Sequence, residues 1–245
     1  MFFYVKGFYK VAALLFVSAI ICVAFIYAKR MYGQADFGKT FGVKATAAEK
    51  QLNAMQDEFA LCKNICNADA KFMQSIVFPE VMRYSSIKDG IEAESLRTLY
   101  VQFGAAYANF SIGLFQMKPG FAEQVETRSM QLLPENIYKE LQLAYSSTGQ
   151  QSIRQQRVER LQDKDWQMVY LTAFISLCNE MYKSKIFSSP TEKLQWYATV
   201  YNAGFDKTDT YISNKITQEN FYLEKNMPGK KFKYASLAAW FYKKR

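Results

Sequence analysis

One carboxylate in this sequence has the spacing of a group that is buried on a helix. Phe72, Ile76 and Glu80 follow one another at intervals of four residues, so they lie along one helical face. Because Phe72 and Ile76 are core residue types, the Glu80 carboxyl is expected in apolar surroundings, where burial raises the pKa of a carboxyl. A carboxyl that stays protonated near neutral pH can act as a general acid toward a glycosidic oxygen.

The same spacing also permits a non-catalytic Glu80. Pro79 should kink the helix at this point, and the kink would either disturb the register or turn the carboxyl toward a cavity. The side chain would otherwise face solvent or pair with Arg83, and exposed glutamate is the norm in proteins. Spacing alone therefore favours the exposed or paired side chain over the catalytic one.

Two further motifs change that balance. Residues 109–119 read NFSIGLFQMKP, and residues 201–204 read YNAG at the end of an expected helix. Gly113 would let backbone approach a sugar closely. Gln116 offers a donor and an acceptor to an amide such as an N-acetyl group, and Tyr201 offers a hydroxyl and a ring. In the alternative interpretation, the apolar residues of the first motif are core and the second motif only ends a helix.

The order of these motifs resembles the soluble lytic transglycosylases and the related goose-type lysozymes, which share the SLT domain. That family has a helix with one catalytic Glu, then a Gly-Leu-Met-Gln-Ile-x-Pro-like loop, then a Tyr-Asn-Ala-Gly helix end. The resemblance covers roughly Asp69–Phe205. It implies a mostly α, lysozyme-like domain with Glu80 as the catalytic residue. It also implies that substrate is bound by Ser111, Gly113, Phe115, Gln116, Met117, Tyr201 and Asn202.

The resemblance implies a cell-wall lyase that needs no cofactor and no metal. One Glu acts as acid and then as base, the N-acetyl group of the substrate assists, and cleavage of the MurNAc–GlcNAc bond leaves 1,6-anhydro ends. A lysozyme-type hydrolase (muramidase) is the alternative, with Glu126, Asp163 or Asp165 as the second carboxylate, although both aspartates suit helix capping better. A third possibility is a non-catalytic peptidoglycan-binding or structural part of an envelope-spanning machine.

The chain departs from the family pattern in several places. Val81 follows Glu80 where the family has Ser, and the stretch from Glu80 to Gly113 is longer than usual, which suggests an inserted element near the substrate. Phe115 and Lys118 replace the more usual Met and a small or polar residue.

Composition narrows the chemistry and the compartment. The sequence contains no histidine, which excludes His-based triads, His metal ligands and His general bases. The formal net charge of +9 suits an anionic partner such as cell-wall polymer or lipid head groups. Its cations are scattered, with no nucleic-acid motif, so no nucleic-acid partner is expected.

The N-terminal segment predicts export. Val11–Ala28 holds 18 residues without a charge and is flanked by lysine and arginine. This is slightly longer than the apolar part of a signal peptide, about 7–15 residues, and close to the roughly 20 that span a membrane. Small residues near Gly33 also suit a cleaved signal peptide. Both alternatives place the chain in the periplasm or cell envelope, as a membrane-anchored or secreted protein, where envelope or secretion machinery is a possible partner.

The expected organisation has three parts. Residues 1–35 are a signal anchor or signal peptide, 36–60 a tether and the start of a first helix, and 61–245 the lysozyme-like transglycosylase domain. Helices are expected at about 47–66, 70–83, 121–132, 134–143, 152–161, 164–185, 190–204 and 232–242. Asp69 is the expected N-cap of 70–83, and Ser189 is that of 190–204. The segment 85–93 resembles a turn, and 94–107 is helical or mixed.

The cysteines leave their pairing open. Cys22 lies in the apolar segment, so Cys62, Cys66 and Cys178 allow at most one disulfide and one remaining thiol. A bridge between Cys62 and Cys66 would be strained on a helix, whereas Cys178 could join either one. Three buried thiols are the alternative.

Overall fold

The computed structural model describes residues 37–84, 91–223 and 231–244. The chain divides into a short unit, Met1–Gly42, and a larger unit, Val43–Arg245. The apolar segment 11–28, expected as an anchor or signal, lies outside the described residues. Within the described ranges, no helix is both long enough and apolar enough to cross a membrane.

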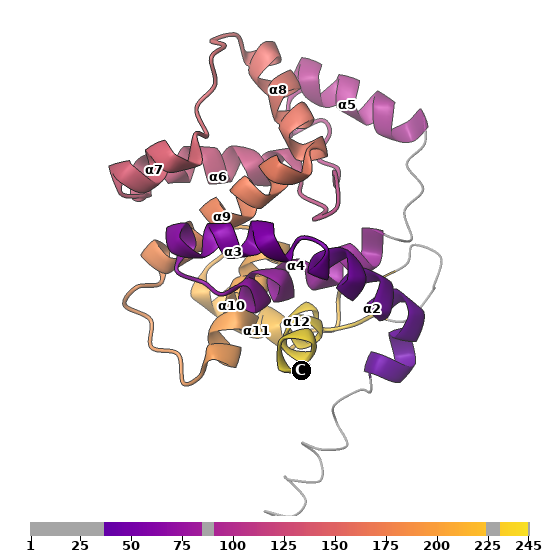
Figure 1. Ribbon diagram of the computed structural model, residues 1–245. Coiled ribbons are helices and arrows are strands. Elements are labelled where there is room, and N and C mark those ends of the chain that lie inside the picture. The colour runs from indigo at the N-terminus through magenta and orange to yellow at the C-terminus, as the bar shows by residue number, and fades with distance from the viewer. Residues whose placement is uncertain (1–36, 85–90, 224–230, 245) are drawn as a thin grey trace, which may run out of the picture. The chain divides into compact units, whose positions relative to one another are not determined.

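The described part of the chain is mostly helical, as the sequence predicts (Figure 1). It holds only isolated backbone bridges in place of strands, at Ile112–Met117 and Phe221–Phe232. Its helices are α2 (Phe37–Asn53), α3 (Gln56–Cys66), α4 (Ala70–Tyr84), α5 (Ile91–Phe103), α6 (Pro119–Leu132), α7 (Glu135–Leu141), α8 (Gln150–Gln162), α9 (Lys164–Met181), α10 (Pro190–Ala203), α11 (Asp209–Ile216) and α12 (Tyr234–Lys243).

Helix α4 lies in the core of the larger unit, and every residue from Phe72 to Met82 is buried. It contacts α12, α10 and α3. The Phe78 ring stacks on Phe241 of α12 with ring centroids 4.1 Å apart, a geometry that adds about 0.5–1.5 kcal/mol to simple burial. Pro79 lies inside α4, which nevertheless continues to Tyr84. The helix that carries Glu80 is therefore held from several sides.

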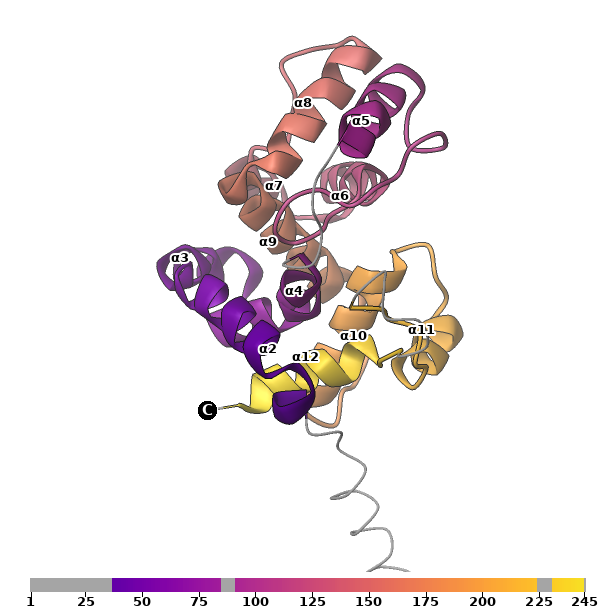
Figure 2. The same cartoon turned by 90° about the vertical axis from the view of Figure 1, so that its right-hand side faces the viewer.

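Helix α9 connects two groups of helices within the larger unit. Figures 1 and 2 both show α5–α8 on one side of α9 and α10–α12 on the other. Helix α9 contacts α6 and α8 of the first group and α10 of the second. Its residues from Tyr170 to Cys178 are all buried, so the expected core helix is confirmed.

Side-chain caps fix the starts of three of these helices, as their sequences predict. The Asp69 carboxylate accepts the Phe72 N–H at 2.7 Å at the start of α4. The Asp163 carboxylate accepts two backbone N–H groups at the start of α9. The Ser189 hydroxyl accepts the Glu192 N–H at 3.2 Å at the start of α10. Each cap supplies a partner to backbone donors that the helix itself leaves unpaired.

Several element boundaries differ from the sequence prediction. The single helix expected at 47–66 is two helices that break at Ala54 and Met55. The tether expected up to residue 46 is wrong from Phe37 onward, where α2 begins. Helix α11 was not predicted, because its eight residues are too short for a clear apolar period. The turn expected at 85–93 lies outside the described residues up to 90, and α5 begins at Ile91.

The three described cysteines form no disulfide. Cys66 and Cys178 are buried, and Cys62 is half-buried. The Cys66 thiol donates to the Cys62 carbonyl at 3.3 Å, and burial raises its pKa to about 12. The interpretation as unbridged thiols therefore holds for these positions.

Candidate active site

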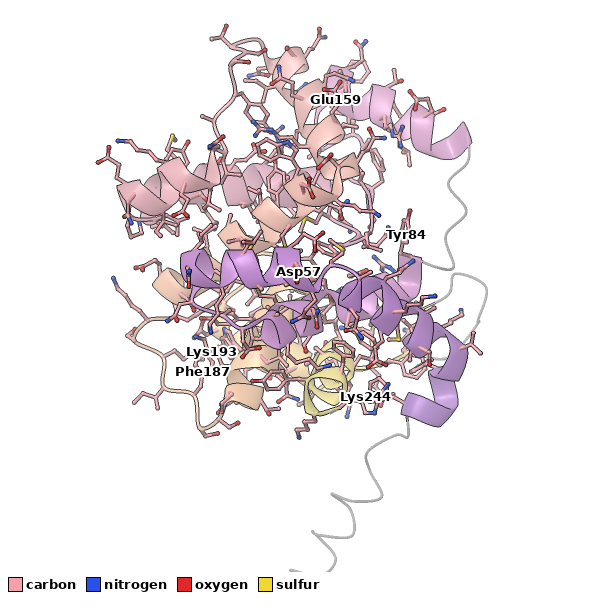
Figure 3. All side chains as sticks on the ribbon, in the orientation of Figure 1. Asp57, Tyr84, Glu159, Phe187, Lys193 and Lys244 are labelled. Carbon is pink, nitrogen blue, oxygen red and sulfur yellow. The ribbon has the colours of Figure 1, made fainter. Side chains whose placement is uncertain are left out.

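One cavity of about 880 Å³ is lined by segments that are far apart in the sequence. It lies at the C-terminal end of α4, against the loop before α6, α6 itself and the end of α10. Tyr84, the last residue of α4, marks this end of the helix in Figure 3. The lining thus draws on both groups of helices that α9 connects.

Five of the eight residues expected from the sequence line this cavity. They are Glu80, Gln116, Met117, Tyr201 and Asn202. The other three, Ser111, Gly113 and Phe115, are not among its lining residues. The motifs therefore converge on one place, with part of the loop facing away from it.

The Glu80 carboxyl is buried, with 4% of its surface exposed. Burial raises its pKa from 4.5 to about 7, and the cations Arg83 and Lys118 and the Asn202 side chain act in the opposite direction. Burial prevails because the charged form loses its hydration throughout the side chain. Glu80 is therefore poised to hold or release a proton near neutral pH, as its position on the Phe72–Ile76 face predicts.

Arg83 also pairs with Glu80, as the non-catalytic alternative in the sequence analysis predicts. Its Nη2 lies 2.7 Å from Glu80 Oε2. The contact is an ion pair without hydrogen-bond alignment, so Oε2 accepts no hydrogen bond from the described residues. Both sequence interpretations of Glu80 hold in part, because the carboxyl is buried and also has a cation beside it.

Buried polar atoms without a hydrogen-bond partner gather at this cavity. Such atoms are rare in folded proteins and call for an explanation. Among the described residues, half of those found belong to side chains that line the cavity: Glu80 Oε2, Arg83 Nε, Gln116 Oε1 and Gln124 Oε1. The gathering of four such atoms at one cavity marks it as the candidate site for a polar ligand.

The loop before α6 holds Gln116 in an unusual conformation. The Ile112 and Met117 backbones exchange hydrogen bonds of 2.8 and 3.1 Å, which closes a tight turn. Gln116 has a φ of 52°, in the left-handed region. Its Nε2 donates to the Gly113 carbonyl at 2.8 Å, which leaves Oε1 as an acceptor at the cavity. A strained, buried position of this kind is common at functional sites.

Gly113 serves a different purpose from the one expected. With a φ of +69°, a Cβ at this position would lie 1.8 Å from Gln167 Nε2 and 2.6 Å from the Leu161 carbonyl oxygen. The missing side chain therefore makes room for Gln167 of α9. Gly113 does not line the cavity, so it is not placed to let backbone approach a sugar there. Gln167 Oε1 accepts the Phe115 N–H at 2.7 Å, and its Nε2 donates to Leu161 O at 2.8 Å.

Phe115 and Tyr201 tie the loop to the core. The Phe115 ring is fully buried, 6.2 Å from the Phe59 ring, so it packs in the interior. The Tyr201 hydroxyl donates to the Phe115 carbonyl at 2.8 Å. Ser111 lies 3.5 Å from Arg83 Nη2, and its hydroxyl accepts from that guanidinium. These contacts position the loop and the Arg83–Glu80 pair.

Sequence reasoning missed the supporting residue Gln167 and most of the charged lining. A glutamine on the apolar face of the expected 164–185 helix was the available signal for Gln167, since a buried polar side chain requires partners. The charged lining residues Glu123, Arg128, Asp206 and Lys207 follow no motif. They come together because α6 packs on α9 and its Phe121 ring contacts Tyr201 near the end of α10.

The carboxylates considered for a two-carboxylate mechanism are engaged elsewhere. Glu126 is bound by Arg157, with Nη2 to Oε2 at 2.5 Å, and by the Tyr170 hydroxyl at 2.5 Å. Asp163 caps α9. Neither these two residues nor Asp165 lines the cavity.

A second cavity of about 580 Å³ lies near Phe187 and Lys193, which Figure 3 labels. Lys193 Nζ and the Tyr197 hydroxyl both donate to Asn179 Oδ1, at 3.1 and 2.9 Å. None of its described lining residues carries a buried polar atom without a partner. The cavity at Glu80 is therefore the better candidate site.

The described residues contain no group of three or more Cys, Asp or Glu side chains arranged to hold a metal ion. Comparison of the chain with protein-family models, with curated proteins and with solved structures finds no match.

Proposed function

We propose that this protein is a peptidoglycan lytic transglycosylase with a lysozyme-like helical fold, which cleaves the MurNAc–GlcNAc bond of glycan strands. The observation that carries the proposal is the buried carboxyl of Glu80, with a pKa of about 7, in a cavity of about 880 Å³. The convergence of Gln116 and Tyr201 on the same cavity supports it, since both belong to the motifs that resemble the family.

The proposed reaction uses Glu80 twice. The protonated carboxyl gives its proton to the glycosidic oxygen as the bond to the MurNAc C1 carbon breaks. The resulting carboxylate then takes the proton of the MurNAc 6-hydroxyl as that oxygen bonds to C1, which leaves a 1,6-anhydro end. A pKa of about 7 suits both steps, because the two protonation states have similar free energies near neutral pH.

Gln116 supplies a group for orienting the substrate. Its Oε1 is buried at the cavity without a hydrogen-bond partner among the described residues. An N-acetyl N–H would satisfy this acceptor and bring the acetamido group, which assists the reaction, next to the scissile bond.

The other carboxylates of the cavity favour a one-carboxylate mechanism over a hydrolase with two. Glu123 is bound by the Tyr100 hydroxyl at 2.9 Å and by Arg157 at 3.2 Å. Asp206 is paired with Lys207 at 2.7 Å, and that hydrogen bond lowers its pKa. Asp206 is therefore a poor general base, because its partner stabilises the unprotonated form. The hydrogen bonds to Glu123 occupy its Oε1.

The proposed location is the periplasm or cell envelope, as a membrane-anchored or secreted enzyme. The apolar segment 11–28, between flanking cations, supports export. The net charge of +9 suits the anionic cell wall.

Digestion of purified peptidoglycan by the parent protein and by Glu80→Gln tests the proposal. The parent should release soluble fragments, and Glu80→Gln should lose at least about 100-fold in rate, the usual contribution of a positioned general acid. Glu135→Gln is the matched control, because this glutamate is 80% exposed on α7, outside the cavity. A parent that releases no fragments, or a Glu80→Gln variant as fast as the control, would overturn the proposal.

A further inference from the structure

The carboxylates that line the cavity each contact a cation, but two of the lining cations form no ion pair within the described residues. Glu80 pairs with Arg83, and Asp206 pairs with Lys207. Glu123, the third carboxylate, contacts Arg157, a cation outside the cavity lining that it shares with Glu126. All three carboxylates thus have a cation, whereas Lys118 and Arg128 form no ion pair within the described part of the chain.

These two unpaired cations both belong to the α6 segment, at separate points along the cavity. Lys118 is the residue before α6, and Arg128 is ten positions further on. At a rise of about 1.5 Å per residue, the two backbone positions are about 15 Å apart along the helix axis. At this separation, one small anion cannot contact both side chains. The pair therefore suits a ligand whose negative charges recur along its length.

Each cation has a defined neighbourhood. Lys118 is exposed and close enough to Glu80 to lower the pKa of that carboxyl. The Arg128 guanidinium lies over the Phe205 ring, 5.5 Å from its centroid, which restricts its position. It also lies close enough to Asp206 to lower the pKa of that carboxyl, although the two form no ion pair. Lys118 therefore marks the end of the cavity nearest the candidate acid, and Arg128 marks a point further along α6.

We propose that Lys118 and Arg128 are two anion subsites that bind carboxylates spaced along one glycan strand, so that the strand runs along α6. This inference rests on the proposed function and names its preferred substrate as the carboxylate-bearing strand. Two sources supply such carboxylates in peptidoglycan: the lactyl groups of muramic acid without peptide, and the stem peptides where they are attached. A neutral N-acetylglucosamine oligomer offers no negative charge to either cation and should bind less tightly.

Binding to the inactive Glu80→Gln variant tests this inference without turnover. This background also removes the effect of Lys118 on the Glu80 pKa. Calorimetric titration would use three probes: a neutral N-acetylglucosamine hexamer, peptide-free strands with lactyl carboxylates, and peptide-bearing strands. The charged strands should bind more tightly than the hexamer, and the difference should shrink as salt screens the charges.

Adding Lys118→Gln and Arg128→Gln should weaken binding of the charged strands by roughly 2- to 30-fold, as expected for two exposed ion pairs. Binding of the neutral hexamer should not change. A loss with peptide-free strands identifies the lactyl carboxylates, and a loss confined to peptide-bearing strands identifies the stems. Equal losses for charged and neutral probes, or no loss for any probe, would overturn the inference.

Two further variants distinguish the effect of cations at the cavity from the effect of the protein's overall positive charge. Lys63→Gln with Lys183→Gln removes two exposed lysines outside the cavity, and should leave binding unchanged. Lys118→Arg keeps the charge at the end of the cavity near Glu80 and should retain affinity within about 3-fold. Loss of binding in the Lys63→Gln, Lys183→Gln variant, or loss of binding in Lys118→Arg, would contradict the assignment.

The inference and the proposed function can fail separately. If the parent digests peptidoglycan and the double variant binds all probes as the Glu80→Gln background does, the inference alone fails. If the parent digests nothing and the charged strands still bind through Lys118 and Arg128, the function fails and the anion subsites stand.

Discussion

Arg83 Nη2 lies 2.7 Å from Glu80 Oε2, and the Glu80 carboxyl nevertheless keeps a pKa of about 7. The two residues are one helical turn apart on α4, at the edge of the cavity. Burial raises the pKa of Glu80 more than Arg83 lowers it. The arginine therefore tunes the carboxyl into the range in which one group can act as acid and then as base.

Removal of this cation should raise the pKa of Glu80. In Arg83→Met, the alkaline limb of the pH–rate profile for peptidoglycan digestion should shift upward by about one to three pH units, since an adjacent opposite charge shifts a carboxyl by that amount. Arg97→Met is the control, because Arg97 pairs with the exposed Glu94 outside the cavity. An unchanged or lowered limb in Arg83→Met would show that Arg83 does not tune Glu80.

The raised pKa of Glu80 should also make folding stability depend on pH. The folded state holds the proton more tightly than the unfolded chain, so stability should fall as pH rises from about 4.5 to about 7. The loss attributable to Glu80 is about 3 kcal/mol, because each pKa unit corresponds to about 1.4 kcal/mol.

Glu80→Gln removes this contribution while keeping the shape of the side chain. In chemical denaturation at about pH 4 and about pH 8, the stability difference between parent and variant should change by about 3 kcal/mol in favour of the variant at the higher pH. The effects of other titrating groups cancel in this comparison. A difference that stays constant with pH would mean that the folded carboxyl has an ordinary pKa.

Helical periodicity and caps predicted much of the fold, because they depend on near neighbours in the sequence. The spacing of Phe72, Ile76 and Glu80, taken together with the two later motifs, favoured a buried carboxyl, and Asp69 and Ser189 predicted two helix starts. The break near Met55 carries no proline or glycine, so no local signal marked it.

The lining of the site was predictable only in part. Sequence motifs indicated Gln116 and Tyr201, which do line the cavity. Gly113 was assigned to the substrate, because a glycine in a loop does not reveal what approaches it; the structure places Gln167 there. Arg128 belongs to no motif, and its position depends on the long-range packing of α6.

The fit between Gly113 and Gln167 gives a stability prediction. Gly113→Ala should destabilise the protein by at least about 1–3 kcal/mol, because the φ of +69° strains an L-residue and the new Cβ meets Leu161 backbone at 2.6 Å. Gly149→Ala should change stability by less than about 1 kcal/mol, since nothing lies within 4 Å of its added Cβ. Thermal unfolding of both variants checks this, and equal melting temperatures would contradict the close approach.

Arg157 should be important for the wall of the cavity formed by α6. Its side chain is 8% exposed and binds Glu126 at 2.5 Å and Glu123 at 3.2 Å. Arg157→Met should cost about 3–5 kcal/mol, because it leaves the largely buried Glu126 without its cation. Adding Glu126→Gln, which removes the charge and keeps an acceptor for the Tyr145 and Tyr170 hydroxyls, should recover part of that loss in denaturant unfolding. If the double variant is no more stable than the single one, the cost does not come from an uncompensated carboxylate.

The masses of the digestion products test the central proposal most directly. Peptidoglycan treated with the parent should yield muropeptides with 1,6-anhydro ends, each lighter by one water than the hydrolysed product, and Glu80→Gln should yield neither form above background. Reducing ends in place of anhydro ends would contradict the transglycosylase, and anhydro products from Glu80→Gln at the parent rate would contradict the role of Glu80.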